Sequence, residues 1–377
     1  MAIEIREIGT TKRELLKFVQ YPIDFLYRNS KQYVPDLISD MLNTVDPAQN
    51  PAFDFCEAVY FMAYRDGRPV GRIAGIINRV VNEREHRPEA RFGFVDFIDD
   101  DEVVDALFDA VARWAKQKGM TQLTGPLGFT DMDKEGCLIE GFDELGTQET
   151  IYNYPYYSKQ IERMGFQKDA DWVEFKVFVP EQTPEKMHRM AQIVAKRYGV
   201  HSVRNLDRKT LVRRYGDQIF HLINDAYDKL FGYSPLSEKQ IKHYIDIYLP
   251  MLPLDHISIV VNDNDEAVGV GISIPSLSEA LIRCRGRFLP LGWWHMLRAM
   301  RGKTDVVDLL LIAVKPELQG AGINAIFFDD LVPVYIQRGY KWAESNPELE
   351  SNDKVQRQWQ YFRTEQHRRR RAYTKPL

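Results

Sequence analysis

A repeated order of expected elements is the feature that most constrains the fold of this chain. Residues 56–81 contain two apolar strand patterns around an Asp-Gly turn, and residues 256–275 contain a second such pair around an Asn-Asp turn. Turns of this kind between two strand patterns are a strong short-range signal of a β-hairpin. In both halves the expected elements include this hairpin, a helix, a glycine break, a strand and a further helix. We therefore expect two copies of one mixed α/β fold, with one domain at residues 1–180 and a second at residues 181–377.

Composition limits the class of protein. Of the 377 residues, 44% are apolar, which is enough for sizeable cores and excludes a disordered chain. The 50 Lys and Arg against 54 Asp and Glu give a net charge of −4, which argues against a general nucleic-acid binder. The longest apolar runs are far shorter than the roughly 18 residues that span a membrane, and residues 1–18 lack the apolar segment of a secretory signal. We expect a cytoplasmic protein. No metal is expected, because the three cysteines and eight histidines show no ligand spacing.

A glycine-containing loop between an expected buried strand and a helix carries the clearest functional signal. The strand ends at Val314, and the loop then runs through Gln319, Gly320, Ala321, Gly322, Ile323 and Asn324. Glycines let backbone N–H groups approach an anion, and a helix N-terminus adds its dipole. The pattern lacks the Lys-Ser/Thr of a P-loop and the third glycine of a dinucleotide-binding loop. It predicts a pyrophosphate cradle; the alternative is an ordinary strand-to-helix turn.

This loop resembles the acyl-CoA loop of the GCN5-related N-acetyltransferase (GNAT) superfamily, which reads Arg/Gln-x-x-Gly-x-Gly/Ala after a strand that ends in Val-x-Pro. The matching positions are Val314, Pro316, Gln319 and Gly322, whereas Asn324 stands where Gly or Ala is usual. The element order of the superfamily covers about residues 254–375. The resemblance implies that backbone amides from Gln319 to Asn324 hold the pyrophosphate of acetyl-CoA or another acyl-CoA. It also implies that the strands at Val314 and at residues 342–344 separate to admit the pantetheine.

The first half resembles the same fold without this loop. Three aspartates and a glutamate, at residues 99–102, occupy the corresponding junction, where they would repel a phosphate. We therefore predict that the N-terminal copy does not bind CoA in the usual way. The whole chain is also similar to a group of bacterial tandem proteins of this superfamily, whose landmarks stand here at Gly71–Ala74, Gly125-Pro126, Glu140–Phe142 and Tyr156-Tyr157.

Transfer of an acyl group to an amine needs a base, and often an acid for the leaving thiolate. Asp308 lies eleven residues before Gln319, the spacing at which histone acetyltransferases of the superfamily place a catalytic glutamate. Glu344 ends the next expected strand. For both carboxylates the alternative is an ordinary satisfied group at a strand end. The superfamily's tyrosine acid would fall at Trp359, and Tyr361, two positions on, is expected to be a packing residue.

Two asparagines complete the candidate set. Asn346 and Asn352 either position the substrate or pantetheine amides, or cap a helix that we expect over residues 351–366.

Two further segments leave several interpretations open. Residues 284–303 combine large apolar side chains with basic ones, which suits peripheral lipid or acyl-chain contact, a lid, a dimer contact or a packed helix. The run Arg368–Arg371 lies in the expected last strand. It is interpreted as a solvated or salt-bridged edge, with RNA or the CoA 3′-phosphate as the other candidate partner.

Together these features predict an acyl-CoA-dependent N-acyltransferase whose acceptor is a small-molecule or peptide amine. Two alternatives stay open: a transferase that uses aminoacyl-tRNA as donor, and a non-catalytic acyl-CoA-binding pseudoenzyme. The sequence leaves the acyl chain length and the oligomeric state undetermined.

Overall fold

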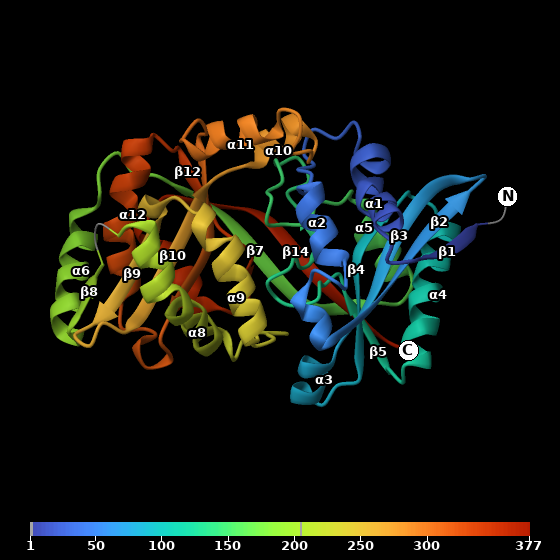
Figure 1. Ribbon diagram of the computed structural model, residues 1–377, viewed down its shortest axis with the longest axis horizontal. Helices are drawn as coiled ribbons and strands as arrows, with labels where there is room; N and C mark the ends of the chain where they lie inside the picture. The colour runs from blue at the N-terminus through green and yellow to red at the C-terminus, as the bar shows by residue number, and fades with distance from the viewer. Residues whose placement is uncertain (1–2, 204–205) are drawn as a thin grey trace. The chain divides into compact units, whose positions relative to one another are not determined.

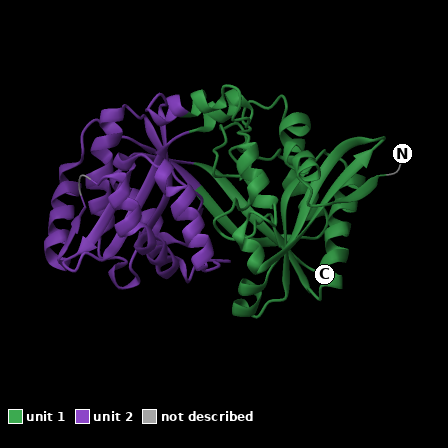
Figure 2. Cartoon of the chain, in the orientation of Figure 1, with its two compact units in different colours: residues 1–173, 277–296, 367–377 green, residues 174–276, 297–366 purple. Residues whose placement is uncertain are grey.

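The computed structural model describes residues 3–203 and 206–377, which form two compact units (Figure 2). Unit 1 contains the chain up to residue 173 together with residues 277–296 and 367–377, and unit 2 contains residues 174–276 and 297–366. The chain therefore returns twice to unit 1 from the half that the sequence analysis assigned to the second domain. The mixed α/β class is confirmed, because each unit consists of a β-sheet covered by helices (Figure 1).

Unit 1 is built on a sheet with the strand order β1-β2-β3-β4-β5-β14, and β6 pairs with β14. Its strands are β1 (Glu4–Ile8), β2 (Cys56–Arg65), β3 (Arg68–Asn78), β4 (Glu89–Phe97), β5 (Gln122–Gly125), β6 (Cys137–Glu140) and most of β14 (Thr364–Pro376). Its helices are α1 (Lys12–Tyr21), α2 (Ile38–Val45), α3 (Arg79–Glu85), α4 (Asp101–Gln117), α5 (Tyr156–Arg163) and α10 (Ser278–Cys284).

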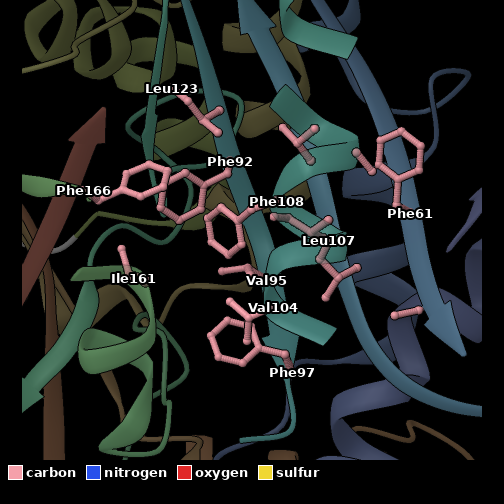
Figure 3. Packing of buried hydrophobic residues seen from close by; sticks show 14 of the residues in the cluster. Phe61, Phe92, Val95, Phe97, Val104, Leu107, Phe108, Leu123, Ile161 and Phe166 are labelled. Atoms are coloured by element: carbon pink, nitrogen blue, oxygen red, sulfur yellow. The ribbon is translucent and has the colours of Figure 1, made fainter. Parts of the chain in front are cut away.

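The two faces of this sheet carry separate cores, as the period of two along each strand requires. Phe61 of β2 faces the cluster that contains α4, whereas its neighbour Tyr60 packs with α1 and α2. In the α4 cluster the rings of Phe92 from β4, Phe108 from α4 and Phe166 from the turn before β7 lie together, with centroids 5.0 to 5.5 Å apart (Figure 3). Edge-on ring packing of this kind fixes α4 on the sheet.

Unit 2 repeats the plan with the strand order β7-β12-β11-β10-β9-β8, and β13 pairs with β7. Its strands are β8 (Val200–Ser202), β9 (Ile257–Asn262), β10 (Ala267–Pro275), β11 (Val306–Val314), β12 (Trp342–Glu344), β13 (Glu348–Leu349) and the second part of β7 (Gln167–Phe178). Its helices are α6 (Glu185–Tyr198), α7 (Arg208–Thr210), α8 (Gly216–Tyr227), α9 (Glu238–Ile247), α12 (Asn324–Arg338), α13 (Asp353–Gln356) and the end of α11 (Gly292–Met300).

Both units contain a short parallel strand pair that ends early. In unit 1, β4 and β5 pair over residues 89–91 and 122–124. In unit 2, β11 and β12 pair over residues 306–308 and 342–344, although β11 continues to Val314. The repeated element order of the sequence therefore corresponds to a repeated split in a sheet.

One predicted element is wrong. The helix expected over residues 351–366 is reduced to α13 and a 3-10 turn at Arg357–Tyr361, after which β14 begins at Thr364. Within this short turn Trp359 is buried in the core and packs beside α12. No helix within residues 3–203 and 206–377 is long and apolar enough to cross a membrane.

Candidate active site

The glycine loop of unit 2 has the backbone of an anion cradle. Gly320 and Gly322 have φ angles of 81° and 88°, in the left-handed region that favours glycine. The N–H groups of Gly320, Gly322 and Ile323 form no hydrogen bond with another backbone group of the described residues. Helix α12 begins immediately afterwards, with no side-chain cap and no acidic residue in its first turn. Several unpaired donors and the positive end of the helix dipole therefore meet at one loop.

Packing from α6 holds this loop in place. Ile323 is buried and lies in one apolar cluster with Val194 of α6 and Phe327 of α12. The helix lies close to the sheet because β10 has a glycine beneath it: a Cβ on Gly269 would lie 2.8 Å from Phe327 Cζ. The side chain of Gln319 donates to the carbonyl oxygen of Val314 at 3.3 Å. This side-chain hydrogen bond holds the loop in shape and leaves its backbone N–H groups available.

The corresponding junction of unit 1 is acidic, and the start of its helix is capped by a side chain. Asp100 caps α4 by accepting from the Val103 N–H at 3.2 Å, and it also forms two hydrogen bonds with Arg65 at 2.8 and 2.9 Å. The hydrogen bonds from Arg65 lower the pKa of Asp100, so the carboxylate stays charged. A capped helix with a fixed negative charge disfavours a phosphate, which supports the prediction made for this copy.

The sheet splits of the two units also differ in what fills them. In unit 1 the chain after β5 lies against β4, since Leu127 N–H donates to Phe92 O at 2.9 Å. The approach is so close that a Cβ on Gly93 would overlap Leu127 O. In unit 2 a side chain takes this place: Asn346 Nδ2 donates to Leu310 O of β11. The split of unit 2 is therefore bridged by a group that can rotate away, whereas that of unit 1 is filled by main chain.

The structure brings the two predicted carboxylates together at the split of unit 2. Asp308 and Glu344 are register partners, and Glu344 pairs in turn with Lys176 of β7, so an acid, an acid and a base stand in one row. Adjacent strands lie about 4.8 Å apart, which keeps the three side chains within reach of one another. Asp308 and Glu344 are only 3% and 6% exposed. Their neighbours Val307 and Ala343 pack toward α12, so by strand alternation the carboxylates face the other side of the sheet.

A third carboxyl group lies near this split and was missed by the sequence analysis. Glu348 of β13 accepts a hydrogen bond from Trp359 Nε1 at 2.9 Å through Oε1, and its Oε2 is buried with no partner among the described residues. Burial raises the pKa of Glu348 to about 8, although the Trp359 hydrogen bond favours the charged form. The Trp359 ring packs at a tilt of 54° against Phe328 of α12, with ring centroids 5.9 Å apart, so Glu348 lies on the α12 side. The absence of tyrosine at position 359 was the one sequence signal for such a group.

The remaining candidates are placed as follows. Asn324 Nδ2 donates to Gln358 Oε1 at 2.9 Å, which connects the start of α12 to the turn that carries Trp359. Asn352 Oδ1 accepts from Val355 N–H at 3.4 Å and thus caps α13. Tyr361 is not a core residue, since it is exposed, with Lys186 Nζ 5.1 Å from its ring centroid.

The arginine run is engaged within unit 1. Arg368 and Arg370 are buried and donate to the carbonyl oxygens of Leu145 and Ile151. Arg371 forms a bidentate pair with Asp171 at 2.8 and 3.0 Å. The strand is salt-bridged as expected but is not an edge, because β14 lies between β5 and β7 in the strand order and β6 also pairs with it. No group of three or more His, Cys, Asp or Glu side chains with a metal-binding arrangement occurs in the described part of the chain.

Comparison with known proteins agrees with this fold. No family model matches the chain. A solved structure of a tandem GNAT protein from the clavulanic acid biosynthesis pathway aligns over 99% of this chain and 98% of its own, with a TM-score of 0.57 at 12% identity. The chain has the tandem GNAT fold. A second GNAT-fold structure, the GCN5-related glucosamine N-acetyltransferase region of a fungal multi-domain GH3 β-N-acetylglucosaminidase, aligns over 99% of this chain and 38% of its own, with a TM-score of 0.56 at 12% identity.

Two curated proteins are similar over most of this GNAT-fold chain. Protein YghO of Escherichia coli (strain K12) is 25% identical over 373 residues, which cover 97% of this chain and 94% of that protein. A bacterial ceramide synthase of Caulobacter vibrioides (strain NA1000 / CB15N) is 28% identical over 318 residues, which cover 82% of this chain and 80% of that protein.

Proposed function

We propose that this protein is an acyl-CoA-dependent N-acyltransferase whose single CoA site lies in unit 2. The observation that carries the proposal is the loop at Gln319–Asn324, whose unpaired backbone donors lead directly to a split sheet with buried carboxyl groups. The loop donors and the α12 dipole would bind the pyrophosphate, and the split would receive the pantetheine once Asn346 turns aside.

The carboxyl groups on the two faces of the sheet at the split suit the two proton transfers of the reaction. The acceptor must be a neutral amine before it attacks the thioester carbonyl, and Asp308 or Glu344 would take its proton. The new C–N bond forms as the C–S bond breaks, the amide nitrogen releases its extra proton to water, and the thiolate needs a proton. Glu348, which keeps its proton at pH 7 because its pKa is about 8, would supply it from Oε2.

We further propose that the acyl donor and the acceptor are both long-chain molecules. The support is the name of the relative that is 28% identical, a bacterial ceramide synthase. Ceramide is an amide between a fatty acid and a long-chain amino alcohol, so its formation by acyl transfer is the reaction described above with a lipid amine as acceptor.

Calorimetric titration with free CoA tests the cradle. Gly320→Glu places a carboxylate among the loop donors, and Gly339→Glu is its matched control at the other end of α12. Both glycines have positive φ, at 81° and 74°, and open space around a new Cβ, so the two variants carry the same backbone strain. We expect CoA affinity to fall at least tenfold in Gly320→Glu and to stay within twofold of wild type in Gly339→Glu. Wild-type protein that does not bind CoA, or equal losses in both variants, would contradict the proposal.

Turnover then separates enzyme from binder. Release of free thiol from acetyl-CoA and from palmitoyl-CoA is measured with a long-chain amino alcohol as acceptor. We expect release only with palmitoyl-CoA and only when the amine is present. CoA binding without thiol release under any of these conditions would indicate a pseudoenzyme.

A further inference from the structure

A cluster of large apolar side chains is exposed on the segment that returns to unit 1. Phe288, Leu289, Leu291, Trp293 and Trp294 are 43 to 71% exposed, and we call these five residues the apolar patch. They stand within seven consecutive positions, in the loop before α11 and in its first turn. Scattered apolar residues on a surface are ordinary, but a contiguous group that includes two tryptophans indicates an interaction surface.

The patch is carried on a fixed base. Arg287 Nη2 forms two hydrogen bonds of 3.0 Å with the Asp24 carboxylate, and Arg285 Nη2 donates to Ile23 O at 2.9 Å. Gly286 O accepts from Ile38 N–H at 2.9 Å. The apolar side chains are therefore presented outward by a loop that unit 1 holds from beneath.

The positive charge of residues 283–303 favours a negatively charged partner. Residues 283–303 contain six Lys and Arg and no Asp or Glu. Arg298, Arg301 and Lys303, in and just after α11, form no ion pair with any residue that the structure describes. Cations on the helix that carries exposed tryptophans match the headgroup region of an anionic bilayer, which attracts basic residues near its surface.

The same charge disfavours a second copy of the chain as the occupant. A twofold contact would place each copy's patch against the other's. It would bring together two sets of the three cations that have no ion pair among the described residues, Arg298, Arg301 and Lys303, because Arg283, Arg285 and Arg287 are already paired with Glu279 and Asp24. Helix α11, with nine residues, is too short to span a bilayer but long enough to lie in its interface.

We infer that the apolar patch docks this protein on anionic lipid membranes. Phe288, Leu289, Leu291 and the two tryptophans enter the headgroup–acyl boundary, and the arginines around them contact lipid phosphates. This binding goes beyond acyl transfer and does not require it, so loss of catalysis leaves the membrane contact intact.

Vesicle co-sedimentation of the full chain tests the inference, with phosphatidylcholine vesicles compared with vesicles that contain 25% phosphatidylglycerol. We expect the protein to bind the anionic vesicles at least tenfold more tightly, and 0.5 M NaCl to weaken that binding. Leu289→Ser with Trp294→Ser should abolish it. The matched control, Ile193→Ser with Met251→Ser, removes two apolar side chains that are 55% and 58% exposed, against 71% and 48% for Leu289 and Trp294, and should bind like wild type.

A second variant guards against misfolding of the first. Arg298→Glu with Arg301→Glu changes only exposed side chains and should remove the preference for anionic vesicles. The inference is overturned if the wild-type protein co-sediments with neither vesicle type. It is also overturned by a loss of binding that is the same in the Ile193/Met251 control, or by a dimer in light scattering that the Leu289/Trp294 variant dissociates in the absence of lipid.

Discussion

The buried carboxyl group of Glu348 predicts a pH-dependent loss of stability that Glu348→Gln should remove. In the unfolded chain this group titrates at its ordinary pKa of 4.5, and burial raises that pKa to about 8 in the folded protein. Between these values the folded state holds a proton that the unfolded state has released. The free energy of unfolding therefore falls as the pH rises through this window, by up to about 1.4 kcal/mol per pH unit.

The size of the effect follows from the same two values. The rise from 4.5 to about 8 corresponds to a total of about 5 kcal/mol, reached above pH 8 where both states are ionised. The neutral amide of Gln keeps the hydrogen bond from Trp359 and has no proton to lose. The variant's advantage over wild type should thus grow by about 2–3 kcal/mol between pH 6 and pH 8.

Urea unfolding at pH 6, 7 and 8 measures this difference. Glu365→Gln, at an exposed position near the start of β14, is the control and should stay within about 0.5 kcal/mol of wild type at every pH. If the difference between Glu348→Gln and wild type is the same at pH 6 and pH 8, the buried group ionises normally and the reasoning is refuted. The effect of Glu348→Gln on activity should be opposite to its effect on stability. Loss of the proposed acid should lower kcat about 10²–10⁴-fold, although the variant is more stable than wild type.

Three further outcomes are expected. Of Asp308→Asn and Glu344→Gln, the variant that removes the base should lower kcat about 10²–10⁴-fold with unchanged CoA affinity in calorimetry; full activity in both variants would refute a carboxylate base at this split, and a weaker CoA complex would assign the residue to binding. Gly269→Ala, whose Cβ would meet the Phe327 ring at 2.8 Å, should cost about 1–3 kcal/mol in urea unfolding; an unchanged midpoint would show that the ring moves freely. Arg72→Met leaves Asp96 buried without its 2.8 Å partner and should cost about 3–5 kcal/mol, a loss that Asp96→Asn in the same chain should partly restore.

Local patterns predicted much of the fold because each depends on neighbouring residues. The Asp66-Gly67 hairpin, with φ of 53° and 74° at its turn, and the Gly339 end of α12, with φ of 74°, require only backbone geometry that the residue types already favour. The loop at Gly320 and Gly322 has the positive φ angles that glycine permits. Its role as a CoA cradle stays a prediction until binding is measured.

Features that depend on packing between residues far apart in the sequence could not be predicted from local patterns. The turn at Arg357–Tyr361 has the apolar spacing of a helix, but Trp359 is drawn into the core beside α12 and shortens it. The residues next to Glu348 do not predict its raised pKa, since the shift arises from burial of the carboxyl group in the folded chain. The return of residues 277–296 to unit 1 rests on Arg287 and Asp24, which are 263 residues apart.

The position of β14 sets an order of events during synthesis. Thr124 of β5 and Thr374 of β14 are 250 residues apart, yet their strands pair through consecutive residues. At about 5–20 residues per second, the ribosome needs on the order of 10–50 s to make the intervening chain. Throughout that time the nascent sheet of unit 1 presents the open edge of β5, and all of unit 2 emerges before the edge is covered. A nascent chain arrested before residue 364 should therefore recruit holdase chaperones that the released protein does not bind.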